Sequence, residues 1–201
     1  MKKHINKKVV VMIVALSLAL CTIIGSTVAW LVSKTEPVTN TFTYGDINIT
    51  LEETDTGDGD DDPNTNEYIM VPGNTITKDP KVTVKANSED SWLFVKMEKS
   101  ENFDSFMTYD MADGWIALEG VEGVYYREVA KSDADAEFAV IKDNTVNVKG
   151  DVTKEMLNAL DADGKSDYPK LVVTAYAVQR DADIDAIDTA AEAWALVTAQ
   201  G

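Results

Sequence analysis

Cysteine and histidine are almost absent from the chain. Its 201 residues include one cysteine, Cys21, and one histidine, His4, and both precede the point at which we expect the chain to be cleaved. The mature chain would then hold no thiol and no imidazole. This excludes disulfides, Cys and His nucleophiles, Ser-His triads, and zinc sites with His or Cys ligands.

Basic residues are also scarce. The chain has 18 Lys and Arg against 35 Asp and Glu, a formal net charge of −17. Four of the lysines lie in the first eight residues, so 14 basic and 35 acidic residues, a balance of −21, would remain after cleavage. Such a surface repels phosphate backbones and anionic lipids. We therefore expect no nucleic-acid partner, and membrane contact only through the uncleaved signal peptide.

A single long hydrophobic run lies near the N-terminus. Residues 9–24 are mostly apolar, follow four lysines and precede small residues. The run is shorter than the ~20 residues that cross a bilayer comfortably, and Thr27-Val28-Ala29 suits a signal peptidase. We predict a signal peptide over residues 1–29, cleaved between Ala29 and Trp30. The alternative is an uncleaved anchor, since residues 28–32 would lengthen the span.

Hydrophobic residues make up 45% of the whole chain, and after the N-terminal run they mostly alternate with polar residues. Period-two patterns predict half-buried strands, and β-branched and aromatic runs predict more. The predicted strands cover residues 47–52, 68–71, 81–86, 92–98, 124–129, 138–141, 145–149 and 171–179. Helices do not alternate with these strands, which disfavours a parallel α/β fold. We expect an all-β fold, an antiparallel two-sheet sandwich formed by one domain over residues 46–201.

Short helical segments interrupt the strand pattern. Residues 152–160 place Val152, Met156, Leu157 and Leu160 on one face, with Asp151 or Thr153 as the N-cap. Residues 187–198 predict an amphipathic C-terminal helix with one stripe of Ile187, Ala191 and Trp194 and another of Ala190, Trp194 and Val197. Residues 102–107 form a third, shorter candidate. Residues 52–67 have little to bury and predict a mobile acidic loop.

One acidic cluster has the spacing of a calcium loop. Asp181, Asp183, Asp185 and Glu192 fall at positions 1, 3, 5 and 12, as in an EF-hand. Position 6 is Ala186, where the sharp turn favours glycine. The alternative interpretation is a set of acids that precede a helix N-terminus, where the helix dipole favours negative charge. Calcium is the one ion that this spacing suggests. We expect no required cofactor and no catalytic residue.

Several segments together resemble one family. Two segments near the N-terminus are Gly25-Ser26-Thr27-Val28-Ala29-Trp30-Leu31 and the run from Thr39 to Leu51. Three further segments are Met70-Val71-Pro72-Gly73-Asn74, Val82-Thr83-Val84 and Trp92-Leu93-Phe94-Val95-Lys96. Near the C-terminus they are Ala175-Tyr176-Ala177-Val178-Gln179 and Ala190-Ala191-Glu192-Ala193-Trp194. In this order they resemble the TasA/camelysin family of exported Gram-positive proteins, whose signal peptides are processed by the peptidase SipW. Residues 101–165 carry no such likeness.

The resemblance implies a jelly-roll sandwich that is secreted and assembles into fibres of the biofilm matrix or cell surface. In such fibres the N-terminal strand of one subunit completes the next. Residues 30–45 would form this extension, and Trp30, Leu31, Val32, Phe42 and Tyr44 would supply the donated apolar side chains. An exposed strand of this kind can pair with an open sheet edge. The alternative is that residues 39–44 pair within their own subunit, as we expect for residues 46–52.

Two other functions remain open at this point. Camelysin is described as a metal-dependent peptidase, although this chain lacks the His-Glu-x-x-His pattern of zinc peptidases. A surface adhesin or carbohydrate-binding module is the other alternative, with Trp115 after Asp113-Gly114 as the candidate sugar platform. Packing in the core is the competing role for Trp115, as we expect for Trp92 and Trp194.

Overall fold

The computed structural model describes residues 32–34, 47–54, 66–161, 167–180 and 187–199. Strands dominate this part of the chain. They are β1 (Val32–Lys34), β2 (Ile49–Glu52), β3 (Thr75–Thr77), β4 (Lys81–Val84), β5 (Ser91–Lys99), β6 (Met107–Thr108), β7 (Ile116–Ala117), β8 (Val124–Val129), β9 (Ala136–Ala139), β10 (Thr145–Val148) and β11 (Leu171–Gln179). The helices are α2 (Phe103–Phe106), the 3-10 turn η1 (Lys142–Asn144), α3 (Lys154–Ala159) and α4 (Ala190–Ala199).

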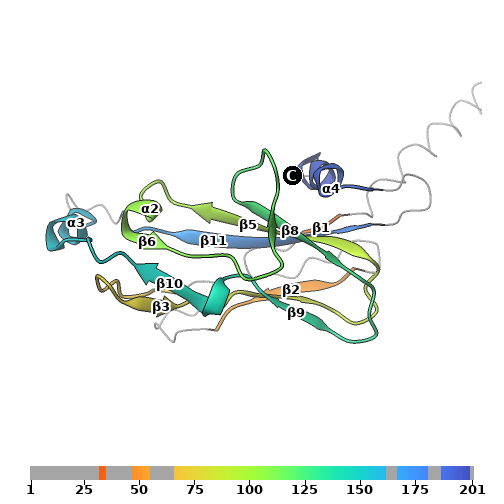
Figure 1. The fold of residues 1–201 in the computed structure, drawn as a ribbon, viewed down its shortest axis with the longest axis horizontal. Helices are drawn as coiled ribbons and strands as arrows, with labels where there is room; N and C mark the ends of the chain where they lie inside the picture. The colour runs from red at the N-terminus through yellow and green to blue at the C-terminus, as the bar shows by residue number, and fades with distance from the viewer. Residues whose placement is uncertain (1–31, 35–46, 55–65, 162–166, 181–186, 200–201) are drawn as a thin grey trace, which may run out of the picture.

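The strands form three antiparallel sheets. The largest has the order β1-β11-β5-β8-β7, and the two smaller sheets have the orders β3-β10-β6 and β2-β4-β9. Figure 1 shows the large sheet above β2, β9, β3 and β10, with α4 on its far side. The expectation of a mostly β, antiparallel fold with a C-terminal helix is therefore confirmed, although the described strands form three sheets and not two.

A local mismatch in length separates the two small sheets. Two stretches of chain, residues 75–84 and 136–148, run beside each other through both sheets, with Thr77 opposite Thr145 and Lys81 opposite Ala139. Between these pairs one stretch has residues 78–80 and the other has residues 140–144. Pro80 has no N–H to donate, and Asp143 and Asn144 have positive φ angles of 53° and 54°. The ladder is therefore interrupted where the longer stretch bulges.

The large sheet is buried on both faces near its centre. Alternate residues of β5, namely Leu93, Val95 and Met97, belong to the main core, which also contains residues of both small sheets. Trp92 and Phe94 face the other way, into a second cluster with α4. This explains the continuous apolar run over residues 92–95 of β5, since a strand that is covered on both faces has no solvent-facing side.

Helix α4 covers the outer face of the large sheet. The ring of Trp194 lies 5.3 Å from the rings of both Phe94 and Tyr176, measured between centroids. Trp92 donates a hydrogen bond of 3.1 Å from Nε1 to the carbonyl of Ile187, just before the helix. The expected core positions of Trp92 and Trp194 are confirmed, with exposed fractions of 6% and 8%.

Most predicted elements are present, and two details are wrong. The strands at 124–129 and 171–179 have the predicted bounds, and Thr153 is the N-cap of α3, where it accepts a hydrogen bond from Met156. Residues 68–71 form no strand: their side chains alternate, but the backbone joins no ladder. Ala191 is exposed, because the buried face of α4 consists of Ala190, Ala193, Trp194 and Val197.

No helix among the described residues has the length and apolar character that crossing a bilayer requires. Residues 1–31, including the predicted signal peptide and its cleavage site at Ala29 and Trp30, lie outside the described part, as do residues 55–65 of the predicted acidic loop.

Candidate functional site: the edge that pairs with the N-terminal strand

Strand β1 forms one edge of the large sheet. It pairs antiparallel with β11, with Val32 opposite Val178, Ser33 opposite Ala177 and Lys34 opposite Tyr176. It is three residues long, whereas β11 is nine residues long and pairs over its whole length with β5. The first strand of the chain thus covers only one end of the last strand.

The other end of β11 has a strand neighbour on one side only, as far as the described residues are concerned. Within the described part of the chain, residues 171–174 pair with β5 and with no second strand. A sheet edge exposes backbone donors and acceptors that can pair with another chain. The side chain of Val172 is 39% exposed at this end, while Val173 is buried in the core. Among the residues that the structure describes, this end of β11 therefore has a strand on one side only, with a partly apolar surface at Val172.

Helix α4 supports the end of β11 that β1 pairs with. The helix contacts both strands. A capping box fixes its first turn: the hydroxyl of Thr189 accepts a hydrogen bond of 3.2 Å from the amide of Glu192, and Oε2 of Glu192 accepts bonds of 3.1 and 2.8 Å from the amide and hydroxyl of Thr189. The position that receives β1 is consequently bounded by a fixed helix on one side and by β11 on the other.

This geometry gives Glu192 a structural role. Its carboxylate, proposed above as the last ligand of a calcium loop, is engaged at the start of α4. The other proposed ligands, Asp181, Asp183 and Asp185, lie outside the described residues. Among the residues that the structure does describe, no group of three or more His, Cys, Asp or Glu side chains is arranged to hold a metal ion.

Two titratable side chains, Lys96 on β5 and Tyr176 on β11, lie on or next to β11. Lys96 donates a hydrogen bond of 2.7 Å to Glu98, and this bond is the main reason why the pKa of Lys96 is raised. Tyr176 on β11 lies opposite Phe94 on the neighbouring strand β5, and burial raises the pKa of its hydroxyl. At neutral pH the tyrosine is uncharged and the lysine is paired. Neither of these two groups therefore places an unpaired buried charge beside β11.

Of the predicted donor residues, only Val32 lies in the described part, where its backbone pairs with Val178 of the same chain. Trp30, Leu31, Phe42 and Tyr44 lie outside it. The sequence analysis did not identify β11 as the receiving strand. A partial signal was present, because the mostly apolar sequence of residues 171–178 is typical of a strand that is buried on both faces.

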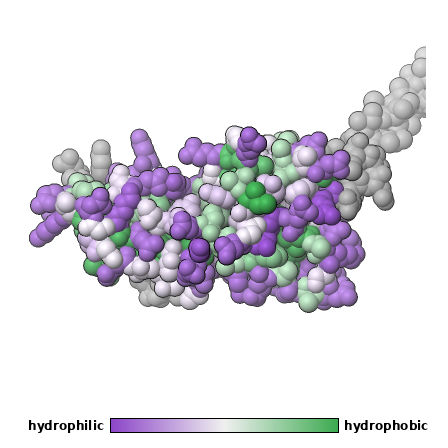
Figure 2. Space-filling model, in the orientation of Figure 1, coloured by the Kyte–Doolittle hydropathy of each residue, from purple (hydrophilic) through white to green (hydrophobic). Residues whose placement is uncertain are grey.

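The surface offers little else for assembly on the face that Figure 2 shows. Hydrophilic residues dominate that face, and the hydrophobic areas are small and separated. The large apolar side chains that are exposed among the described residues are Ile69 and Val71 from one segment, Tyr168 and Val172 from a second, and Ile116 from a third.

Trp115 does not form an exposed platform. Its ring is 8% exposed, and Nε1 donates a hydrogen bond of 2.8 Å to the carbonyl of Ala139. The guanidinium of Arg127 lies over the ring, 5.4 Å from its centroid. The packing role of Trp115 is thus confirmed, and its partner Arg127 could not be predicted from a local sequence pattern.

Known proteins provide no independent guide to this edge. Comparisons of the chain with protein-family models, with curated proteins and with solved structures give no match.

Proposed function

We propose that this protein is an exported structural subunit of the cell surface or biofilm matrix of a Gram-positive bacterium, and that it forms fibres by donating its N-terminal strand to a neighbouring subunit. The observation that carries the proposal is the pairing of β1 with β11. The first strand of the chain occupies a sheet edge and contacts the rest of that sheet through three residues of β11.

Strand donation requires little rearrangement from this starting point. An edge strand at the end of a chain can leave its sheet without disturbing the order of the other strands. The same three residues of a second copy can then pair with β11 in the same register, with Val32 opposite Val178. Exchange of an identical element between subunits replaces each contact by its equivalent, so its cost in free energy is low. The exchange is heterologous, and it extends into a filament if it does not close into a ring.

The proposal includes a two-layer, jelly-roll-like arrangement. The large sheet would form one layer and the two small sheets the other. In support, residues from all three sheets contribute to one core cluster, among them Leu51, Val82, Leu93, Val146 and Ala177. The interruption between the small sheets is local, since hydrogen bonds from Lys78 to Asn144 and from Val140 to Pro80 continue across it.

Export would control the assembly. We propose that a signal peptidase of the SipW class cleaves between Ala29 and Trp30, which releases residues 30–45 as an extended arm. Before cleavage the signal peptide would hold this arm at the membrane. Assembly would need no cofactor, and the protein would have no enzymatic activity of its own.

The test uses electron microscopy of protein that starts at Trp30. We expect filaments from this form and folded monomers from a form that lacks residues 30–43, because the second form keeps β11 but has no strand to donate. A synthetic peptide of residues 30–43 should shorten the filaments of the first form by occupying β11, and a scrambled peptide of the same composition is its control. Polymerisation of the deleted form, with circular dichroism showing that it is folded, would contradict the proposal.

A further inference from the structure

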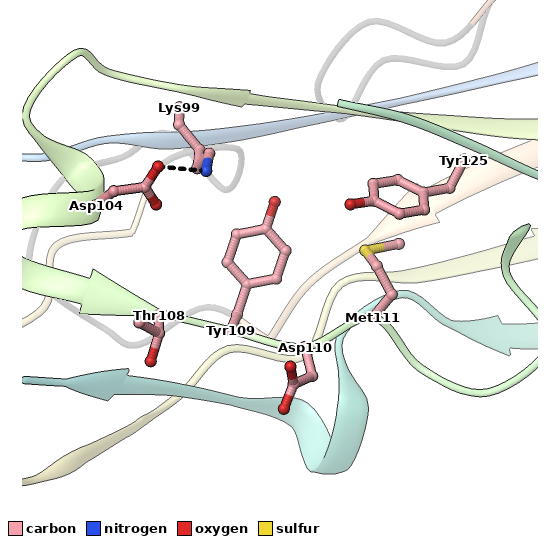
Figure 3. A pocket seen from close by; sticks show the side chains of 7 residues that line it. All are labelled: Lys99, Asp104, Thr108, Tyr109, Asp110, Met111 and Tyr125. Atoms are coloured by element: carbon pink, nitrogen blue, oxygen red, sulfur yellow. Dashed lines mark hydrogen bonds and ion pairs between the residues drawn. The ribbon is translucent and has the colours of Figure 1, made fainter. Parts of the chain in front are cut away.

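A small pocket opens between the large sheet and the segment that follows β6. Its volume is about 270 Å³, near the lower end of the ~300–1,000 Å³ typical of ligand sites. Figure 3 shows the side chains that line it. Lys99 and Tyr125 come from β5 and β8 of the large sheet, Asp104 comes from α2, and Tyr109 and Met111 come from the segment after β6.

The two tyrosines point into the same space. Residues 108–111 are extended, so that successive side chains alternate: Tyr109 and Met111 point toward the large sheet, and Thr108 and Asp110 point away from it (Figure 3). The hydroxyl of Tyr125 points back across the pocket toward Tyr109. Two phenol groups from different layers of the molecule therefore converge on one pocket.

Neither of these hydroxyls has a hydrogen-bond partner among the described residues. Burial raises the pKa of Tyr109 well above its ordinary value, and the neighbouring Tyr125 and Asp104 raise it further. The phenol is therefore neutral at any physiological pH and can both donate and accept. The ring of Tyr109 packs edge-on against Phe103, with 5.9 Å between centroids, which holds the hydroxyl in place. Neither hydroxyl is among the fully buried polar atoms without a partner, so both are open to solvent in the pocket, where a ligand hydroxyl can replace water.

An ion pair forms the opposite wall of the pocket. Nζ of Lys99 lies 2.6 Å from a carboxylate oxygen of Asp104. The pair offers further donors on the ammonium and acceptors on the carboxylate. Asp110 also lines the pocket, so its charged lining consists of one lysine and two aspartates. Met111 and the edges of the two tyrosine rings provide apolar surface between these polar groups.

We propose that this pocket binds one neutral saccharide unit. A sugar ring presents several hydroxyls that each donate and accept, and these match two phenols and an ion pair around a pocket of this volume. An anionic ligand is disfavoured, because the chain carries a net charge of −17 and the only lysine of the pocket is already paired. This binding is independent of strand donation, since none of the five side chains belongs to β1 or β11.

The test is titration of the purified full chain with the methyl glycosides of glucose, galactose and N-acetylglucosamine, followed by ligand-observed NMR. We expect saturable binding of at least one neutral glycoside. Tyr109→Phe and Tyr125→Phe should each weaken it about 3- to 10-fold, the usual effect of one lost hydrogen bond. Both variants keep the ring, so that the fold is retained. Sodium glucuronate, which carries a carboxylate, should bind more weakly than methyl glucoside.

A matched control is available at another tyrosine. Tyr168 is 43% exposed and its hydroxyl bonds the carboxylate of Asp161, away from the pocket. Tyr168→Phe should leave glycoside binding unchanged. The inference is overturned if no neutral glycoside binds saturably at millimolar concentration, or if the double variant of Tyr109 and Tyr125 binds as well as the unchanged protein. Filament formation by the Tyr109→Phe variant would be unaffected in either case, which separates this result from the test of strand donation.

Discussion

The guanidinium of Arg127 stacks on the ring of Phe138, with the central carbon 4.0 Å from the ring centroid. Arg127 belongs to β8 of the large sheet and Phe138 to β9 of a small sheet, so this contact joins two sheets. Trp115 provides a second aromatic surface for the same guanidinium. The Nε atom of Arg127 is buried without a hydrogen-bond partner among the described residues, and burial lowers the pKa of the side chain. Contact with the aromatic rings is therefore the main interaction that offsets the loss of hydration of the Arg127 guanidinium.

We expect Arg127 and Phe138 to be energetically coupled. A cation over an aromatic ring contributes about 0.5–2 kcal/mol, depending on how far the pair is removed from water. A double-mutant cycle with Arg127→Met and Phe138→Leu should give a coupling energy of about 1 kcal/mol in urea unfolding. Both substitutions keep apolar volume, so that the cycle reports the stacking. Additive effects of the two substitutions would show that the stack does not hold the sheets together.

Gly123 should tolerate no side chain. Its φ angle is +73°, and a Cβ atom there would lie 2.6 Å from the carbonyl oxygen of Met97, within the large sheet. We expect Gly123→Ala to destabilise the protein by about 2–4 kcal/mol, which combines left-handed strain of ~1–2 kcal/mol with a backbone clash. Gly120→Ala is the control, since φ is +77° there but no atom lies within 4 Å of the added carbon. Equal losses in urea unfolding would show that the clash is absent.

A partly buried ion pair anchors the segment that follows β2. Lys78 lies 2.8 Å from the carboxylate of Glu53, their side chains are 13% and 15% exposed, and Tyr68 donates a bond of 2.6 Å to the same carboxylate. Lys78→Met should cost about 2–3 kcal/mol, somewhat less than the ~3–5 kcal/mol for removing one partner of a fully buried pair. Adding Glu53→Gln should recover part of this loss in thermal unfolding, because no unpaired charge would remain. A double variant less stable than Lys78→Met alone would contradict this explanation.

A second contact in this region should depend on pH. Burial acts to raise the pKa of Asp79, but hydrogen bonds from the hydroxyl and amide of Thr54 outweigh it, so that the pKa lies below its ordinary value of 3.8. A carboxylate with a lowered pKa stabilises the fold above its unfolded pKa, and this stabilisation is lost as the pH falls through the folded pKa. Thr54→Val should therefore destabilise the protein at about pH 6, by about 0.5–1 kcal/mol, and have a smaller effect below about pH 3.

NMR titration of the Asp79 carboxyl checks this prediction directly. The apparent pKa should rise in Thr54→Val, because the hydroxyl that donates a 2.7 Å bond to Oδ2 is removed while the amide bond to Oδ1 remains. Thr54→Ser retains the hydroxyl and is the matched control. A pKa that is the same in the valine and serine variants would show that the hydroxyl does not stabilise the carboxylate.

Elements that depend on a local sequence pattern could be predicted, whereas elements that are too short to show a pattern could not. Strands β8 and β11 and helices α2, α3 and α4 were predicted because their apolar patterns are local and long enough to recognise. Strands β3, β6 and β7 are two or three residues long and were missed, since no periodicity can be seen over such lengths. Residues 68–71 show the limit of the alternation rule, because an extended segment can alternate between core and solvent without a neighbouring strand.

The candidate site depends on contacts that the sequence does not encode locally. Pairing of Val32 with Val178 sets a register between residues far apart in the chain, and the Arg127 stack joins residues from three segments. Both are decided by how the sheets pack, which overrides local propensity. Likewise, Tyr109 and Tyr125 become neighbours only when β8 lies against the segment after β6. A single sequence thus predicts the elements, but only the fold brings these side chains together.

The register of β1 allows strand donation to be tested by disulfide trapping. Ser33 lies opposite Ala177, and directly opposed residues in an antiparallel pair have Cα atoms about 4.5–5.5 Å apart, within the range of a disulfide. We expect Ser33→Cys with Ala177→Cys to form a disulfide upon oxidation. The chain that starts at Trp30 has no other cysteine, because Cys21 has been removed. A disulfide can therefore form only at the two introduced positions.

The size of the crosslinked product distinguishes the two pairings. If β1 is donated, oxidised filaments should give a ladder of covalent oligomers in denaturing gels without reductant, since each bond joins two subunits. If β1 pairs within its own chain, the same filaments should give only monomers with an internal bond. Ser33→Cys with Val173→Cys is the control, because residue 173 lies four residues and about 13 Å along β11 from the partner of Ser33. Crosslinking in the control would mean that β1 does not hold a fixed register, and monomers alone from the opposed pair would contradict donation through β11.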